Sequence, residues 1–187
     1  MTLLPILPFA HDLLKKAIRP GGQVIDGTCG NGNDTVLLAE LVGENGQVFA
    51  FDIQSQAIEA TRQKLTEQNL LAPVTLIQDS HDQISEHVKT PIQAAIFNLG
   101  YLPGGDKQIT TRASSTIKSV EQILALLEPN GILIIVVYHG HPEGKIEKEQ
   151  LEAFTTELPQ QEFHVLQYRY VNQKNNPPYV LVIEKRK

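Results

Sequence analysis

A glycine-rich turn between an apolar segment and a helix start constrains this chain more than any other feature. Two apolar residues run into Asp26, and Gly30 and Gly32 follow before a helical pattern that begins at Asp34. Glycine permits a positive φ and lets a ligand approach the main chain closely, and a helix start offers free N–H groups. This succession of strand, turn and helix predicts a nucleotide-binding loop.

The spacing of the glycines separates two classes of nucleotide fold. A dinucleotide fold carries G-x-G-x-x-G, whereas here Gly27 is followed by Gly30 and Gly32, which disfavours an NAD-dependent oxidoreductase. The loop resembles the D-x-G-x-G-x-G first motif of the class I S-adenosylmethionine-dependent methyltransferases. Asp26 and the last two glycines are in register, and Thr28 stands in place of the first glycine. We expect Thr28 to keep a negative φ.

The next apolar run, residues 47–51, ends at Asp52. An acid at this distance after a glycine loop is positioned to bind the two hydroxyls of a ribose. The loop and the acid together predict S-adenosylmethionine as the cofactor. The alternative is a buried strand whose final Asp caps an ordinary glycine turn.

Length and composition fit a single methyltransferase domain spanning residues 1–187. Hydrophobic residues make up 41% and charged residues 20%, which indicates a soluble globular protein with no membrane span. The longest apolar run, residues 132–138, is far shorter than the ~20 residues of a membrane-spanning helix. The N-terminus lacks the basic region and cleavage site of a signal peptide, and the single cysteine allows no intramolecular disulfide. A cytoplasmic location is therefore expected.

The rest of the chain alternates apolar runs with helical patterns. Helices are expected at residues 8–18, 34–42, 55–69, 116–127 and 147–158, the third capped by Ser55, and strands at residues 24–26, 47–51, 73–77, 93–97, 132–138, 163–171 and 179–184. No crossover helix fits between the last two strands, so they must pair as a hairpin. This order predicts an α/β fold with a doubly wound, mostly parallel seven-stranded sheet and a C-terminal antiparallel hairpin, Rossmann-like in class.

Five polar loops follow the carboxyl ends of the predicted strands, the edge at which open α/β sheets bind ligands. These loops are residues 26–33, 52–54, 79–81, 98–106 and 139–144. In the first two, Asn31, Asn33 and Gln54 can bond to the methionine carboxylate and amine of the cofactor, although Asn is also common in turns for backbone reasons. Cys29 is interpreted as a small apolar filler, since no base stands beside it in sequence.

The third-strand exit corresponds to the place where class I methyltransferases commonly hold adenine. The resemblance implies that Asp79 and Ser80 contribute there, with an acidic side chain accepting from the exocyclic amine. For His81 two interpretations are open. It either contacts the ligand, as its place at a strand's carboxyl end favours, or it is a surface histidine that caps the next turn.

The fourth-strand exit, Asn98-Leu-Gly-Tyr101, resembles the [D/N/S]-P-P-[Y/F] motif of amino-group methyltransferases without its two prolines. The resemblance implies that Asn98 accepts a hydrogen bond from the target nitrogen and that Tyr101 packs on the target base. An alkylammonium target must lose a proton before attack, and Asp106, His139 and His141 are candidate acceptors. The two histidines lack a third ligand in view, so no metal site is expected.

Several strings together resemble one bacterial family of class I methyltransferases, the rRNA methylase family. They are residues 28–35, 51–54, 98–103, 138–145 and 172–175, and the resemblance covers nearly the whole chain. It implies N-methylation of the aminomethyl group of 5-aminomethyl-2-thiouridine at the wobble position of tRNA, which gives 5-methylaminomethyl-2-thiouridine. The implied partner is the tRNA anticodon loop.

The net charge of −5 argues against broad binding of duplex nucleic acid. It permits recognition of a single-stranded loop by a few stacked bases and a local basic rim. The candidates for this rim are Tyr101, Lys107, Arg112, Tyr138, Lys145 and Arg169. Other open alternatives are a methyltransferase of another RNA such as rRNA, a methyltransferase of a small amine metabolite, and a nucleotide-binding regulatory module without chemistry. A homodimer is also left open.

Overall fold

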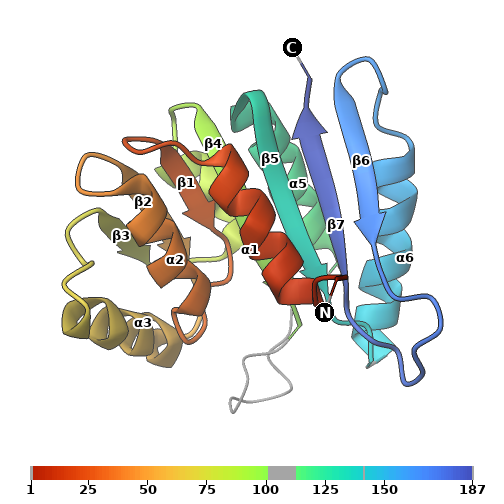
Figure 1. The fold of residues 1–187 in the computed structure, drawn as a ribbon, viewed down its shortest axis with the longest axis horizontal. Coiled ribbons are helices and arrows are strands. Elements are labelled where there is room, and N and C mark those ends of the chain that lie inside the picture. The colour runs from red at the N-terminus through yellow and green to blue at the C-terminus, as the bar shows by residue number, and fades with distance from the viewer. Residues whose placement is uncertain (1, 101–112, 141, 187) are drawn as a thin grey trace.

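The computed structural model describes residues 2–100, 113–140 and 142–186, and Figure 1 shows their arrangement. The helices are α1 (Ile6–Ala17), α2 (Asn33–Val42), α3 (Ser55–Glu67), the short 3-10 helix η1 (His81–Gln83), α4 (Ile84–His87), α5 (Ala113–Leu126) and α6 (Pro142–Thr156). The strands are β1 (Gln23–Asp26), β2 (Gln47–Phe51), β3 (Val74–Ile77), β4 (Ile92–Leu99), β5 (Leu127–Val137), β6 (Phe163–Tyr168) and β7 (Tyr179–Lys185).

The strands form a seven-stranded sheet in the order β3-β2-β1-β4-β5-β7-β6. Strands β1 to β5 pair in parallel, while β7 pairs antiparallel with both β5 and β6. The order reverses between β1 and β4, which is the switch point at which open α/β sheets bind ligands. The predicted doubly wound sheet with a C-terminal antiparallel hairpin is confirmed.

Helices cover both faces of this sheet, because the buried strands carry apolar residues on both sides. Val24 packs with the α1 and α2 side chains, whereas Ile25 beside it packs in the cluster that contains the α5 residues Val120 and Ile123. Figure 1 shows α1 and α2 in front of the sheet and α5 behind it. Successive strand residues thus pack on opposite faces of the sheet and form one apolar layer on each side. The ends of the parallel strands lie together along one edge of this sheet.

Helix α1 runs opposite to the parallel strands, so its first turn lies near their carboxyl edge (Figure 1). The helix contacts β5, β4 and β7. Its Phe9 ring stacks on Tyr168 of β6 with centroids 3.8 Å apart, and the Tyr168 hydroxyl donates to the Leu4 carbonyl at 2.7 Å. The N-terminal segment is therefore fastened to the C-terminal hairpin beside the ligand edge.

The structure differs from the sequence-based expectation at several element ends. Strand β4 continues through Asn98 and Leu99, because both pair with β5. The Pro-Asn-Gly segment 129–131 lies inside β5, where the register with β4 shifts between the pairs Ile92–Leu127 and Ala94–Ile132. Ser55 begins α3, and the residue before it is the N-cap, with no side-chain cap bond. The one-turn helices η1 and α4 are too short to show a periodic pattern.

None of the helices within the described ranges combines the length and the apolar character that crossing a membrane requires.

Candidate active site

The glycine loop between β1 and α2 has the backbone form that its sequence predicts. Gly30 and Gly32 have φ values of 51° and 77°, while Thr28 is not among the described residues with positive φ. The Thr61 hydroxyl of α3 donates to the Gly30 carbonyl at 3.1 Å, and a Cβ on Gly32 would lie 3.0 Å from the Thr61 Cα. Cys29 is buried in an apolar cluster, and this burial raises the pKa of its thiol, as expected of a filler residue.

Asp26 shapes the loop from inside the core. Its side chain is fully buried; one oxygen accepts from the Thr28 N–H at 3.1 Å and the other from the Thr35 hydroxyl at 2.6 Å. Burial, reinforced by the charge of Asp34, raises the pKa of the Asp26 carboxyl. The expectation that Asp26 contacts the cofactor is therefore corrected, because its carboxylate is enclosed and occupied by the loop and by α2.

Asp52 joins the exit of β2 to the glycine loop. Its Oδ2 accepts from the Gly30 N–H and its Oδ1 from the Gln54 N–H, both at 3.0 Å. Partial burial raises the pKa of this carboxyl. An ionised carboxylate offers about four acceptor positions, so these two bonds leave capacity for ligand hydroxyls. The Gln54 side chain accepts from Gln56 at 3.1 Å, on the turn that starts α3.

At the exit of β3, Asp79 accepts from the Ser80 N–H at 2.7 Å and pairs with the His87 ring at 2.8 Å. The bond from His87 lowers the pKa of the Asp79 carboxyl. Ser80 is the N-cap of η1, where its hydroxyl accepts from the Asp82 N–H at 3.4 Å. Neither Asp79 nor Ser80 lines the cavity described below.

The expectation of a surface histidine at position 81 is wrong, whereas the predicted ligand contact of His81 stays a prediction. The side chain is buried, its Nδ1 lies 2.5 Å from the Ser119 hydroxyl of α5, and its ring packs edge-on against Phe97. Desolvation lowers the pKa of His81 to about 4, so the ring is neutral at physiological pH. His81 therefore packs η1 against α5 and neither caps an exposed turn nor faces the cavity.

A cavity of about 580 Å³ opens at the switch point between β1 and β4. The predicted residues that line it are Gly30, Asn31, Asn33, Asn98, Tyr138 and His139; its other described lining residues are Leu7, His11, Thr28, Cys29, Asp34, Leu99, Gly100, Gly140 and Asn176. Asn33 also accepts from Lys64 of α3 at 2.6 Å. These lining residues include no Lys or Arg, and Asp34 is the carboxylate among them.

A hydrogen-bond network across this cavity was not expected from the sequence. Asp34 Oδ1 lies 2.7 Å from Nε2 of His11, and Asp34 Oδ2 accepts from Nδ2 of Asn98 at 2.6 Å. The backbone N–H of Asn98 donates to the Thr28 hydroxyl at 2.7 Å. Asp34 stands in the first turn of α2, where an acid is favoured by the helix dipole alone. Because an acid is common at this helix position, nothing in the sequence indicated that Asp34 belongs to the site.

Two residues at the β5 exit complete the described wall. His139 Nε2 lies 3.0 Å from the Pro177 carbonyl. A carbonyl can only accept, so Nε2 carries the proton and Nδ1 of neutral His139 has the lone pair. Tyr138 is 38% exposed, and its pKa is raised by burial and by the charge of Asp34. His139 is thus held in one tautomer beside the cavity, as a predicted proton acceptor requires.

The other predicted residues fall into two groups. Tyr101, Lys107, Arg112, Asp106 and His141 lie outside the described residues, so their predicted roles stay predictions. The remaining rim candidates, Lys145 and Arg169, are exposed. Within the described part of the chain, no three His, Cys, Asp or Glu side chains are grouped so that they could hold a metal ion.

The chemistry of the described residues fits S-adenosylmethionine. Its methionine end is zwitterionic, and the amide side chains of Asn31 and Asn33 in the cavity wall can donate to its carboxylate and accept from its amine. The left-handed glycines let the ligand approach the main chain. Asp52 is anchored beside them by the Gly30 N–H, where it can meet ribose hydroxyls.

Comparisons with known proteins agree with this fit. The family model described as "Putative rRNA methylase" matches residues 48–184. A protein of the same description from Clostridium thermocellum is 45% identical and superposes with a TM-score of 0.97, covering 99% of this chain and 100% of that one. A structure from Streptococcus mutans, described as "a putative methyltransferase" in complex with SAH, is 42% identical with a TM-score of 0.91, covering 98% of this chain and 99% of the other.

A third relative is the chloroplastic tRNA (mnm(5)s(2)U34)-methyltransferase of Arabidopsis thaliana. It is 36% identical over 186 residues, which cover 94% of this chain and 68% of the plant protein. The family model spans most of the chain, and the relatives at this identity cover nearly all of it. The chain therefore belongs to the rRNA methylase family of class I methyltransferases, and its cofactor is S-adenosylmethionine.

Proposed function

We propose that this protein methylates the aminomethyl nitrogen of 5-aminomethyl-2-thiouridine at the wobble position of tRNA, producing 5-methylaminomethyl-2-thiouridine. The observation that carries the proposal is the 36% identity, over 94% of the chain, to a plant protein named for the methylation of that nucleoside. A cavity with a carboxylate and amides but no Lys or Arg among its described lining residues supports a basic amine as the acceptor.

On the cofactor side, we assign four tasks to the chain's own residues. The backbone of Gly30 and Gly32 brings the loop against the ligand, and Asn31 and Asn33 bond to the methionine end. Asp52 binds the ribose. Asp79 and Ser80 belong to the adenine end, at the exit of β3. When bound, S-adenosylmethionine supplies a methyl group on a sulfonium, which is already a good leaving group.

On the acceptor side, the residues orient the amine and exclude water. Asn98 donates its amide N–H to Asp34, and this orientation leaves Oδ1 as the amide's acceptor for the target nitrogen. His139 Nδ1 provides a second acceptor, because Nε2 is committed to the Pro177 carbonyl. Tyr101, from the same strand exit as Asn98, is proposed to pack on the base, with Asp106 as a further acceptor.

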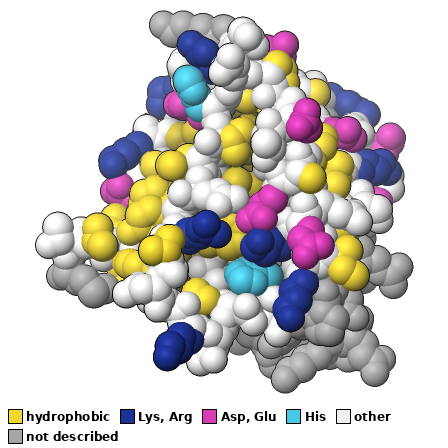
Figure 2. Space-filling model, turned by 90° about the vertical axis from the view of Figure 1, so that its right-hand side faces the viewer, with side chains coloured by type: hydrophobic (Ala, Val, Ile, Leu, Met, Phe, Trp, Pro, Cys, Tyr) yellow, Lys and Arg dark blue, Asp and Glu magenta, His cyan; other side chains and the backbone are white. Residues whose placement is uncertain are grey.

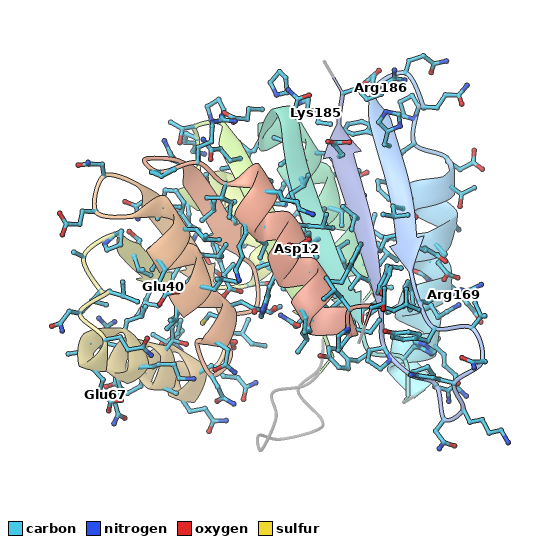
Figure 3. All side chains as sticks on the ribbon, in the orientation of Figure 1. Asp12, Glu40, Glu67, Arg169, Lys185 and Arg186 are labelled. Atoms are coloured by element: carbon cyan, nitrogen blue, oxygen red, sulfur yellow. The ribbon has the colours of Figure 1, made fainter. Side chains whose placement is uncertain are left out.

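The surface supports recognition of a short RNA loop by a local rim. Figure 2, which shows the side formed by β6 and α6, has Lys and Arg interspersed with Asp, Glu and apolar side chains. Arg169 lies on this side (Figure 3), and the predicted rim tyrosine Tyr138 is partly exposed at the cavity. A few cations with stacking aromatic side chains suit a single-stranded anticodon loop better than a duplex.

Mass spectrometry of nucleosides from cells lacking this gene tests the proposal. We expect tRNA to accumulate 5-aminomethyl-2-thiouridine and to lose the methylated nucleoside, and the purified protein with S-adenosylmethionine should restore the methyl group in vitro. Unchanged 5-methylaminomethyl-2-thiouridine in the deleted strain would refute the assignment.

The second candidate is methylation of rRNA, which the description of the matching family favours. The same digests distinguish it when rRNA is analysed beside tRNA. A methylated nucleoside that disappears from rRNA while the tRNA wobble nucleoside is unchanged would support this candidate instead.

A further inference from the structure

We infer that Asp34, supported by His11 and Asn98, is the site that binds the target as a cationic alkylammonium and removes its proton. This inference rests on the proposed function and adds to it a binding site for a primary ammonium group. It is carried by the cavity, by the network around Asp34 and by the distribution of charge along the cavity wall.

The geometry holds the Asp34 carboxylate at the cavity from two sides. His11 of α1 meets one oxygen at 2.7 Å and Asn98 of β4 meets the other at 2.6 Å. The Asp34 side chain is 11% exposed, so the carboxylate is largely desolvated but still reaches the cavity surface. Each oxygen has a second lone pair for an incoming N–H donor.

The charges around the carboxylate favour a cation as its ligand. The described cavity wall contains no Lys or Arg, so Asp34 has no permanent cation as a partner there. His11 is 30% exposed in its side chain and is not permanently charged. In a site of reduced dielectric, an ammonium ion beside an ionised carboxylate is more strongly attracted than in water.

The proton transfer is balanced as follows. One N–H bond of the bound R–CH2–NH3+ breaks, its proton forms an O–H bond on Asp34, and the electron pair stays on nitrogen as the nucleophilic lone pair. That pair then forms the bond to the methyl group while sulfur keeps the pair of the broken carbon–sulfur bond. The proton on Asp34 then passes to the unprotonated Nε2 of His11 while Nδ1 of the same ring releases its proton to water, since the ring is both bonded to Asp34 and partly exposed.

Binding measurements on the purified protein test the site without turnover. The probes are two anticodon hairpins, one with 5-aminomethyl-2-thiouridine and one with 2-thiouridine, titrated by calorimetry in the presence of S-adenosylhomocysteine. Wild type should prefer the aminomethyl hairpin by about tenfold or more, the factor expected of a hydrogen bond to a charged group. Asp34→Asn should abolish this preference and keep its affinity for S-adenosylhomocysteine.

Two further variants make the test specific. His11→Gln can hydrogen-bond to Asp34 but cannot relay a proton, so it should keep the hairpin preference and lower the single-turnover methylation rate. Asp12→Asn is the matched control, since Asp12 is the next residue on α1 (Figure 3) and pairs with Lys16 at 2.7 Å. It should behave as wild type in both measurements.

A retained preference for the aminomethyl hairpin in Asp34→Asn would overturn the inference. Equal losses of hairpin and S-adenosylhomocysteine affinity would also overturn it, because Asp34 would then serve the cofactor. If wild type itself neither prefers nor methylates the aminomethyl hairpin, the proposed function fails before any variant is compared.

Discussion

At the scale of single residues, three aspartates near one loop have three different environments. Asp26 is enclosed and bonded to Thr28 and Thr35, Asp52 is anchored to backbone N–H groups, and Asp34 lines the cavity. Their residue type is identical, so burial and partners decide which one shapes the loop and which ones can meet a ligand.

Asp26→Asn should change how stability depends on pH. Burial raises the pKa of Asp26 from its ordinary 3.8 to about 7, so the folded state holds a proton that the unfolded chain releases. This group therefore lowers the free energy of unfolding as pH rises through that interval. The amide can accept from the Thr28 N–H and donate to the Thr35 hydroxyl, so the variant should keep the fold without this penalty.

Denaturant unfolding of both proteins at several pH values between about 4 and 8 measures the effect. The stability of Asp26→Asn relative to wild type should increase with pH up to about 7 and then level off. Parallel curves for the two proteins would show that Asp26 has no raised pKa in the folded state.

At the scale of elements, the junction between β1 and α2 depends on a close contact with α3. Gly32 is the left-handed N-cap of α2, and the Thr61 backbone lies 3.0 Å from the position of a Cβ there. Gly43, the C-cap of the same helix, also has a positive φ, with an extended ψ of −172°, but a Cβ there would meet nothing within 4 Å. Substitutions at the two ends of α2 therefore differ in one respect. Both strain the backbone, but only the one at Gly32 also meets α3.

Gly32→Ala and Gly43→Ala should both lose stability by about 1–3 kcal/mol, the cost of a positive-φ conformation for a residue with a Cβ. Gly32→Ala should also push the loop away from Thr61 and weaken S-adenosylmethionine binding by roughly tenfold, equivalent to about 1.4 kcal/mol. Thermal unfolding and calorimetry provide the two values. Equal cofactor affinity in both variants would contradict the proposed place of the loop in the cofactor site.

At the scale of the whole molecule, the N-terminal segment meets the C-terminal hairpin at the edge of the sheet where the cavity opens. Helix α1 supplies Leu7 and His11 to the cavity wall, and its Phe9 is stacked on Tyr168 of the C-terminal hairpin. The Tyr170 hydroxyl also donates to the Leu4 carbonyl at 2.8 Å. The hairpin therefore supports the position of α1, and through α1 the position of His11.

Tyr168→Ala should loosen α1, whereas Tyr168→Phe keeps the ring and is the matched control. Loss of the hydroxyl bond alone should cost about 1 kcal/mol; loss of the stacked ring should cost more, since aromatic pairs add about 0.5–1.5 kcal/mol beyond their buried area. Hydrogen exchange of residues 6–17 should accelerate in Tyr168→Ala and change little in Tyr168→Phe. Unchanged exchange in both variants would show that the hairpin does not hold α1.

The sequence by itself determined the order of the elements, the sheet with its C-terminal hairpin and the form of the glycine loop. These features follow from local patterns, because the alternation of apolar residues and the positions of Gly and Pro act over a few residues. The exceptions are instructive: the segment 129–131 has turn residues, but pairing of β5 with β4 on both sides of it holds it within a strand.

Only the tertiary structure decided which polar side chains meet. His11, Asp34 and Asn98 come from α1, α2 and β4, and sequence separations of 23 and 64 residues lie between the bonded pairs. Likewise, His81 follows a strand as a ligand residue would, yet it is buried against Ser119, 38 residues later. Local patterns place the backbone, but a hydrogen bond depends on distances of a few tenths of an ångström between elements, and these are set by how the helices pack on the sheet.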